Sequence, residues 1–170
     1  MKRLSANMAI TIGVLLLIPI QSHAQNTISM EAAEFLPGFH LGSLEGDYAV
    51  VNHYGANLAL GIGTEHFDGN GQMRGTLLLN RPTPAGTREL VSLTSTGTYT
   101  MNEDGTGTMV LAVTLPDGSI KTATEDFVIT RAVWIRGRTV AVEIMDEQRE
   151  QSLVLGSGVF VTQTYTRRGE

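Results

Sequence analysis

The sequence predicts an all-β protein, an eight-stranded antiparallel up-and-down barrel, with a two-sheet β-sandwich as the alternative. Most of the chain between residues 46 and 167 alternates apolar and polar residues with a period of two. β-Branched residues crowd these runs, and Gly, Pro, Asn and Asp separate them. The even spacing and short connections indicate a meander, and closing its last strand onto its first would remove both sheet edges. Turn spacing alone does not distinguish a barrel from a sandwich.

The first 24 residues have the pattern of a Sec-type signal peptide. Lys2 and Arg3 precede the apolar stretch of residues 8–20, and Ser22-His23-Ala24 forms a cleavage motif. We expect cleavage near Ala24 and export to the periplasm or beyond the cell. A membrane anchor needs about 20 apolar residues, so we expect no integral membrane insertion after cleavage.

The remaining chain divides into an N-terminal segment, residues 25–43, expected to be partly flexible, and one barrel domain, residues 44–168. The full sequence has 12 Lys+Arg and 17 Asp+Glu; removing two leader bases and no acid changes the net charge from −5 to −7. An acidic chain without a basic cluster disfavours nucleic acid as a partner. The sequence has no cysteine, which excludes disulfides and thiol nucleophiles. The oligomeric state stays open.

The alternation predicts eight strands in order along the chain. They are expected at Leu44–His53, Ala56–Phe67, Gln72–Asn80, Leu90–Met101, Thr106–Leu115, Ile120–Thr130, Thr139–Met145 and Leu153–Thr166. An outer-membrane barrel would show apolar residues outward and aromatic girdles. Here aromatic residues make up 6% of the chain and the expected outer face is rich in Thr, which disfavours that class.

Three candidate three-residue loops set the expected register. They are Gly69-Asn70-Gly71, Glu103-Asp104-Gly105 and Pro116-Asp117-Gly118, each ending in a Gly suited to the left-handed region. Counting outward pairs apolar residues with apolar residues and places several glycines opposite large side chains, as a tapering barrel interior requires. The expected pairs are Phe67 with Met73, Glu65 with Gly75, Gly63 with Leu77, Tyr99 with Met109, Gly97 with Leu111, Leu111 with Ala123, Met109 with Glu125 and Gly107 with Phe127.

The stretches FDGNGQMRGT (67–76), STGTYTMNEDGTGT (95–108) and DFVIT (126–130) resemble a group of small exported bacterial β proteins with FDG-x-G and TGTYT-x-N-x-DGTGT motifs. That resemblance covers about half the chain after the leader. It implies a β fold and export, and it assigns no activity and no catalytic residue. The architecture is similar to calycin and allene-oxide-cyclase-type barrels, although the lipocalin Gly-x-Trp signature is absent near the first strand.

The acidic loops and the histidines do not predict a metal site. An EF-hand loop closes with a bidentate Glu at its twelfth position, but the twelfth positions here are Leu79, counted from Asp68, and Val113, counted from Asn102. The histidines have neither i, i+4 nor H-x-H spacing. We therefore expect hairpin turns, no metal and no cofactor.

Three polar residues on the expected inner face are candidate catalytic groups: Glu65, Tyr99 and Glu125. A carboxyl group facing an apolar lumen must be paired or have a raised pKa. Tyr99 and Glu125 should lie in one cross-strand row about 10 Å apart. The alternative is structural: Glu65 lies at the rim in water, and Glu125 pairs with Lys121 or Arg138. The expected ligand-binding residues are Phe67, Met73, Tyr99, Met109, Leu111, Glu125 and Phe127.

Three functions are compatible with these observations. The first is a non-catalytic exported barrel that binds a small apolar or amphipathic ligand in its lumen. The second is a cofactor-independent cyclase or isomerase that uses the same lumen. The third is an accessory or inhibitory protein that acts through its outer surface.

Overall fold

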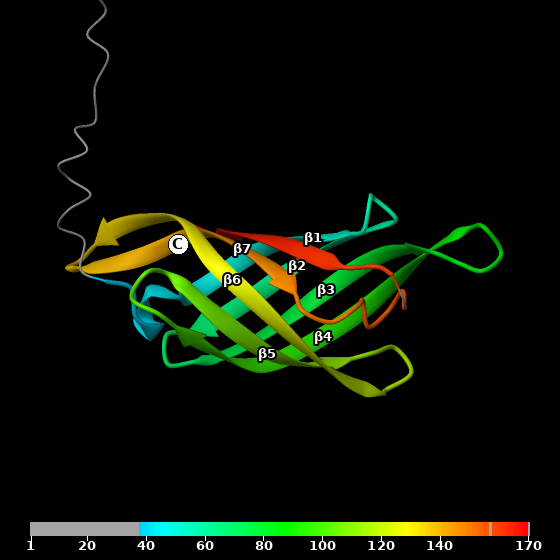
Figure 1. Cartoon of the computed structure of the whole chain (residues 1–170), viewed down its shortest axis with the longest axis horizontal. Helices are drawn as coiled ribbons and strands as arrows, with labels where there is room; N and C mark the ends of the chain where they lie inside the picture. The colour runs from blue at the N-terminus through cyan, green and yellow to red at the C-terminus, as the bar shows by residue number, and fades with distance from the viewer. Residues whose placement is uncertain (1–37, 157, 170) are drawn as a thin grey trace, which may run out of the picture.

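The chain forms a closed antiparallel barrel in which each strand pairs with the next and the eighth pairs with the first. The computed structural model describes residues 38–156 and 158–169. Figure 1 shows the strands running between two ends of an elongated barrel. The elements are η2 (Leu41–Ser43), β1 (Glu45–Tyr54), β2 (Ala59–Asp68), β3 (Gln72–Pro82), β4 (Arg88–Met101), β5 (Thr106–Thr114), β6 (Ile120–Ile135), β7 (Arg138–Gln148) and β8 (Val161–Arg167). The barrel prediction is confirmed; the leader and most of the N-terminal segment lie outside the described residues.

The predicted register is confirmed at all eight pairs, from Phe67 with Met73 to Gly107 with Phe127. Each of the three loops is fixed by an aspartate that accepts a hydrogen bond from the backbone N–H two residues further on. Asp68 accepts from Asn70 at 2.7 Å, Asp104 from Thr106 at 2.9 Å and Asp117 from Ser119 at 2.9 Å. These aspartates therefore serve the turns, as local side-chain hydrogen bonds commonly do.

The structure differs from the predicted strands mainly after residue 130. β6 and β7 extend to a two-residue turn at Arg136 and Gly137, both with positive φ, and their register shifts around Arg131. The predicted eighth strand was wrong over its first half, because β8 begins at Val161. Residues 149–156 and 158–160 lie instead in a connection that turns at Ser152, whose carbonyl accepts from the Gly156 N–H at 3.1 Å.

Inward-facing side chains form two apolar clusters, one toward each end of the barrel. The aromatic cluster surrounds Phe67, whose ring makes edge contacts with Tyr48, Tyr99 and Tyr165 at centroid distances of 5.3, 5.4 and 6.1 Å. The second cluster lies toward the end that carries the β7–β8 connection. Its buried members are Tyr54, Ala59, Leu79, Val91, Leu93 and Val161. The interior is therefore filled from both ends.

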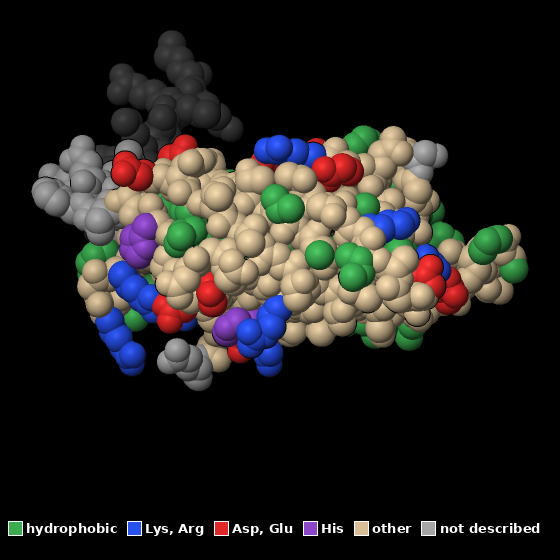
Figure 2. All heavy atoms as spheres, turned by 90° about the horizontal axis from the view of Figure 1, so that it is seen from below, with side chains coloured by type: hydrophobic (Ala, Val, Ile, Leu, Met, Phe, Trp, Pro, Cys, Tyr) green, Lys and Arg blue, Asp and Glu red, His purple; other side chains and the backbone are tan. Residues whose placement is uncertain are grey.

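The outer face is polar over most of its area. Thr94, Thr96, Thr98 and Thr100 are exposed along β4, as the sequence predicts. Figure 2 shows Lys and Arg side chains in small groups beside Asp and Glu on one face of the barrel. One such pair joins Arg149 to Asp126 at 2.7 Å. No helix within the described residues is both long and apolar enough to cross a membrane.

Replacing Gly63 with alanine should destabilise the barrel. A Cβ at this inward position would lie 2.0 Å from the Thr76 carbonyl oxygen and 3.0 Å from Leu77 Cα, both backbone atoms that cannot move without disturbing β3. Overpacking of this kind costs about 1–3 kcal/mol. Urea denaturation should show this loss for Gly63→Ala, and a change within about 0.5 kcal/mol for the outward control Thr64→Ala. Equal stabilities of the two variants would contradict the close strand contact.

Candidate functional site

Three acidic side chains enter the barrel interior from different strands: Glu65 from β2, Glu125 from β6 and Asp146 from β7. We call them the buried acids. Each occupies an inward position of its strand's alternation, two residues from a buried apolar neighbour such as Phe67, Phe127 or Ile144. Glu125 is 3% exposed and Asp146 is 5% exposed. Strand alternation alone therefore places three carboxyl groups inside a closed sheet.

Glu65 lies over Gly75, its partner on β3. A Cβ at Gly75 would lie 2.1 Å from the Glu65 carboxyl carbon, so the missing side chain makes room for this group. Glu65 Oε1 accepts a 2.8 Å hydrogen bond from the Ser95 hydroxyl on β4. Desolvation raises the pKa of Glu65 from 4.5 to about 7, although the Ser95 hydrogen bond opposes the shift.

Glu125 and Asp146 interact directly. Burial raises the pKa of Glu125, and the charge of Asp146 and a hydrogen bond between the two side chains raise it further. Burial also raises the pKa of Asp146, while the Tyr165 hydroxyl, which donates to Asp146 Oδ2 at 2.6 Å, acts in the opposite direction. Two carboxyl groups in contact in a dry site cannot both ionise at ordinary pH. The pair therefore holds a proton through the neutral range.

A cavity of about 60 Å³ lies beside the buried acids, between the two apolar clusters. Its wall combines carboxyl, amide and hydroxyl groups with aliphatic side chains. The lining residues are Val50, Asn52, Tyr54, Glu65, Thr76, Leu77, Leu93, Thr94, Ser95, Leu111, Val113, Ala123, Glu125, Gln148, Leu153, Val154, Val161 and Gln163. The cavity therefore offers both apolar surface and hydrogen-bonding groups to the same occupant.

The β7–β8 connection contributes Leu153 and Val154 to the cavity wall. Its backbone is held by long side chains from the barrel: Lys121 Nζ donates to the Leu153 carbonyl at 3.0 Å, and Arg81 Nη1 donates to the Val154 carbonyl at 3.3 Å. These bonds keep two apolar residues over the interior at this end. In Figure 1 the connection is the orange segment between β7 and β8.

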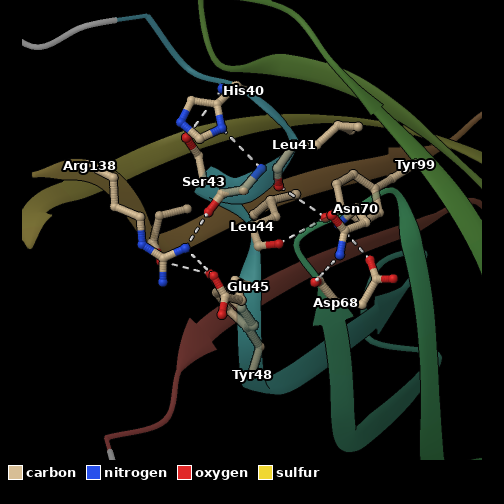
Figure 3. Close-up of polar contacts among 12 residues, drawn as sticks. His40, Leu41, Ser43, Leu44, Glu45, Tyr48, Asp68, Asn70, Tyr99 and Arg138 are labelled. Atoms are coloured by element: carbon tan, nitrogen blue, oxygen red, sulfur yellow. Dashed lines mark hydrogen bonds and ion pairs between the residues drawn. The ribbon is translucent and has the colours of Figure 1, made fainter. Parts of the chain in front are cut away.

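The opposite end is closed by η2 and the residues around it (Figure 3). The Tyr99 hydroxyl points at the Leu41 and Leu44 carbonyls, at 3.0 and 2.8 Å. Arg138 contacts Glu45 and donates to the Gly42 carbonyl. Leu44 is fully buried beneath these contacts. The hydroxyl of Tyr99 therefore ties the N-terminal segment to β4.

The predicted site residues occupy two different places. Leu111 and Glu125 line the cavity, as does the catalytic candidate Glu65. The predicted row of Tyr99, Met109 and Glu125 is confirmed by the strand register. The other five predicted ligand residues belong to the packed aromatic cluster: Phe67, Met73, Tyr99, Met109 and Phe127.

The structural alternatives for the two glutamates are not found. Arg138 pairs with Glu45, and Lys121 donates to the Leu153 carbonyl, so both basic groups expected at Glu125 have other partners. Glu65 Oε2 is buried, which differs from a rim position in water.

Sequence reasoning missed Asp146, Gln148 and Gln163, all of which are buried. Asp146 and Gln148 lie in a charged stretch that resembles a loop, yet they continue the inward alternation from Ile144. Gln163 alternates with Val161 and Tyr165, a signal hidden by placing the start of this strand too early. These residues could have been found by extending the inward alternation of β7 and β8 to positions that are occupied by polar residues.

Within residues 38–156 and 158–169, no three His, Asp or Glu side chains are grouped so that they could hold a metal ion. His66 instead pairs with Asp47 at 2.8 Å, and His40 Nδ1 accepts from the Gly42 N–H at 3.1 Å. The polar residues that line the cavity carry carboxyl, amide and hydroxyl groups.

These features define a class: a closed eight-stranded antiparallel β barrel whose interior holds an aliphatic cavity beside three buried acids. No family model and no curated protein matches the chain. Among solved structures it is similar to a redesigned β barrel, at 14% identity and a TM-score of 0.46, over 76% of this chain and 96% of the other.

Removing the Tyr99 hydroxyl should weaken the closed end. Tyr99→Phe leaves the Leu44 carbonyl without its 2.8 Å donor, and an unsatisfied buried acceptor costs about 1–3 kcal/mol. Urea denaturation should detect this loss. Thr98→Val, which removes an exposed hydroxyl from the neighbouring residue, should change stability by less than about 0.5 kcal/mol. An unchanged Tyr99→Phe midpoint would contradict the role of this hydroxyl.

The buried acids should make the folded state less stable as the pH rises from about 5 to 8. Glu65 has a folded pKa of about 7 against 4.5 when unfolded, so the folded state binds more protons in this window and stability falls with pH. The shift corresponds to roughly 3 kcal/mol for Glu65 alone. Below about pH 4 the trend reverses, because exposed acids such as Asp68 and Asp104 have lowered pKa values.

Denaturation midpoints measured from pH 5 to 8 test this dependence. Glu65→Gln should flatten the slope because it removes the titrating group. Glu147→Gln, an exposed residue beside Asp146 on β7, should leave the slope unchanged. Stability that rises with pH across this window would contradict the raised pKa values.

Proposed function

We propose that this protein is an exported barrel that binds a small amphipathic molecule in its interior cavity without altering it chemically. The observation that carries the proposal is the cavity of about 60 Å³, whose lining combines aliphatic side chains with the buried carboxyl groups of Glu65 and Glu125. At about 10–15 Å³ for each water position, this space holds roughly four to six waters. It suits a molecule of similar size, or the end of a longer one.

The cost of burying acids supports a binding role. Desolvation is the largest cause of the raised pKa at Glu65, Glu125 and Asp146. A barrel interior selected for stability alone would be more stable with aliphatic residues at these positions. Ionisable groups with strongly shifted pKa values cluster at functional sites. We therefore assign the buried acids to recognition of a polar group.

Export is part of this proposal and rests on the leader-like pattern of residues 1–24, which lie outside the described residues. The FDG-x-G and TGTYT-x-N-x-DGTGT resemblance supports the same location. Within the described chain, the polar, Thr-rich outer face suits a barrel surrounded by water.

A second candidate is a cofactor-independent isomerase or cyclase, which the proton held by Glu125 and Asp146 favours. A protonated acid beside Glu65, whose pKa is about 7, provides a donor and an acceptor for moving a proton within one ligand. Incubating the protein with its copurified ligand in D₂O distinguishes the two. Deuterium incorporated into ligand C–H bonds would support the enzyme, and its absence would support binding.

Filling the cavity should abolish ligand retention while preserving the barrel. Ala123 lines the cavity and is 2% exposed, so Ala123→Leu introduces three heavy atoms into the space that a ligand would occupy. Native mass spectrometry of protein purified from its own host should show a bound small molecule in the natural chain and none in this variant. Ala49→Leu, on the exposed side of β1, should retain it. A natural chain without any bound molecule, or retention by Ala123→Leu, would contradict the proposal.

A further inference from the structure

The unpaired oxygen atoms at the cavity indicate which headgroup it accepts. We propose that the cavity binds a primary ammonium group carried on a short apolar chain, an inference that rests on the proposed function and specifies its ligand. Three acceptor atoms of cavity-lining residues are buried without a hydrogen-bond donor: Asn52 Oδ1, Glu65 Oε2 and Glu125 Oε2. A primary ammonium has three N–H donors and no acceptor. Its donors match this set in number and in kind.

These acceptors differ from an acidic surface patch because they are buried away from water. Glu125 is 3% exposed and Asn52 is 5% exposed, so bulk water does not satisfy either group. The other Glu65 oxygen already accepts from Ser95, and Tyr165 already donates to Asp146. The Ser95 and Tyr165 hydroxyls therefore donate to other oxygens, and the three buried acceptors stay available to an occupant.

The charge of the site selects a cation over an anion. The groups that act on the pKa of Glu125 are Asp146, Glu65 and Gln163, and none of these is positively charged. A carboxylate or phosphate headgroup would add negative charge to a dry acidic site, at a large desolvation cost. An ammonium would instead neutralise ionised Glu65 or Glu125 and form charge-assisted hydrogen bonds.

An organic cation fits the walls better than a metal ion. No group of three His, Asp or Glu in the described residues could hold a metal. Besides the polar groups, the wall contains aliphatic side chains, among them those of Leu77, Leu93, Leu111, Val113 and Leu153. Ordinary apolar burial stabilises a short alkyl tail there. With room for roughly four to six waters, n-butylammonium is a suitable probe.

Binding should release a proton, because an ammonium favours the ionised form of the acids. The titratable groups facing Glu125 are Asp146 on β7, Glu65 on β2 and Tyr165 on β8, with Tyr54 on β1 at the cavity wall. The facing residues of β3, β4 and β5 include Leu77, Ser95 and Leu111, which do not titrate. Lowering the pH from 7.5 to 5.5 should therefore weaken binding of the ammonium at least tenfold.

Isothermal titration calorimetry of the full chain after leader removal tests this inference with n-butylammonium, butan-1-ol, butyrate and Ca²⁺. The amine should bind at pH 7.5, and the other three should bind at least tenfold more weakly. Glu125→Gln should weaken amine binding at least tenfold, and Glu147→Gln, with the same charge change on the outer face of β7, should stay within twofold. Glu65→Gln provides the same comparison if circular dichroism shows that Glu125→Gln does not fold.

Several results would overturn the inference. Binding of butan-1-ol or butyrate as tight as the amine would refute the ammonium headgroup while leaving lumen binding intact. Ca²⁺ binding that depends on Glu125 would replace the organic cation by a metal ion. Failure of all four probes would refute the inference, and the native mass spectrum would then show separately whether the cavity holds another molecule. Amine affinity that is unaffected by both Glu→Gln variants would place the amine elsewhere.

Discussion

Pairing of β1 with β8 is the constraint on which the rest of the structure depends. It closes the sheet along Tyr48–Tyr54 and Val161–Arg167, so every strand has one face in water and one in the interior. Because the closed sheet has no free edge, the inward residues have no access to solvent through a sheet edge. Apolar residues at these positions build the two clusters. The few polar residues at inward positions must find partners inside the barrel or retain protons.

The distribution of those polar residues distinguishes the two ends of the barrel. One end is packed with aromatic rings, and the other contains a cavity. Around Phe67 the aromatic rings pack edge to face, and the Tyr99 hydroxyl is bonded to the carbonyls around η2. Toward the β7–β8 connection, Glu65, Glu125 and Asp146 replace aliphatic residues and leave a cavity beside them. The low polarity that holds protons on these acids also strengthens any hydrogen bond made to them. Burial of these acids therefore lowers the stability of the fold and, in the proposed function, strengthens the binding of a ligand.

Much of this fold could be predicted because its turn sequences specify the turn type and therefore the strand register. Three Gly-terminated loops fixed the registers of the β2–β3, β4–β5 and β5–β6 pairs, which placed Glu65 and Glu125 inside. The sequence did not reveal Asp146, because inward polar residues break the apolar alternation by which strands are recognised. The shift at Arg131 and the turns at residues 149–160 also change the pairing of β7 and β8 in ways that propensity does not specify. The aromatic filling depends on side-chain packing, which register alone leaves undetermined.

The central claim is that the barrel keeps at least one proton on its buried acids at neutral pH. Carbon-13 NMR of the side-chain carboxyl groups, assigned through Glu65→Gln, Glu125→Gln and Asp146→Asn, measures this directly. The structure predicts that Glu65 titrates near pH 7 and that the Glu125–Asp146 pair retains at least one proton there. Titration of all three carboxyl groups near their ordinary values of about 4 would contradict the account.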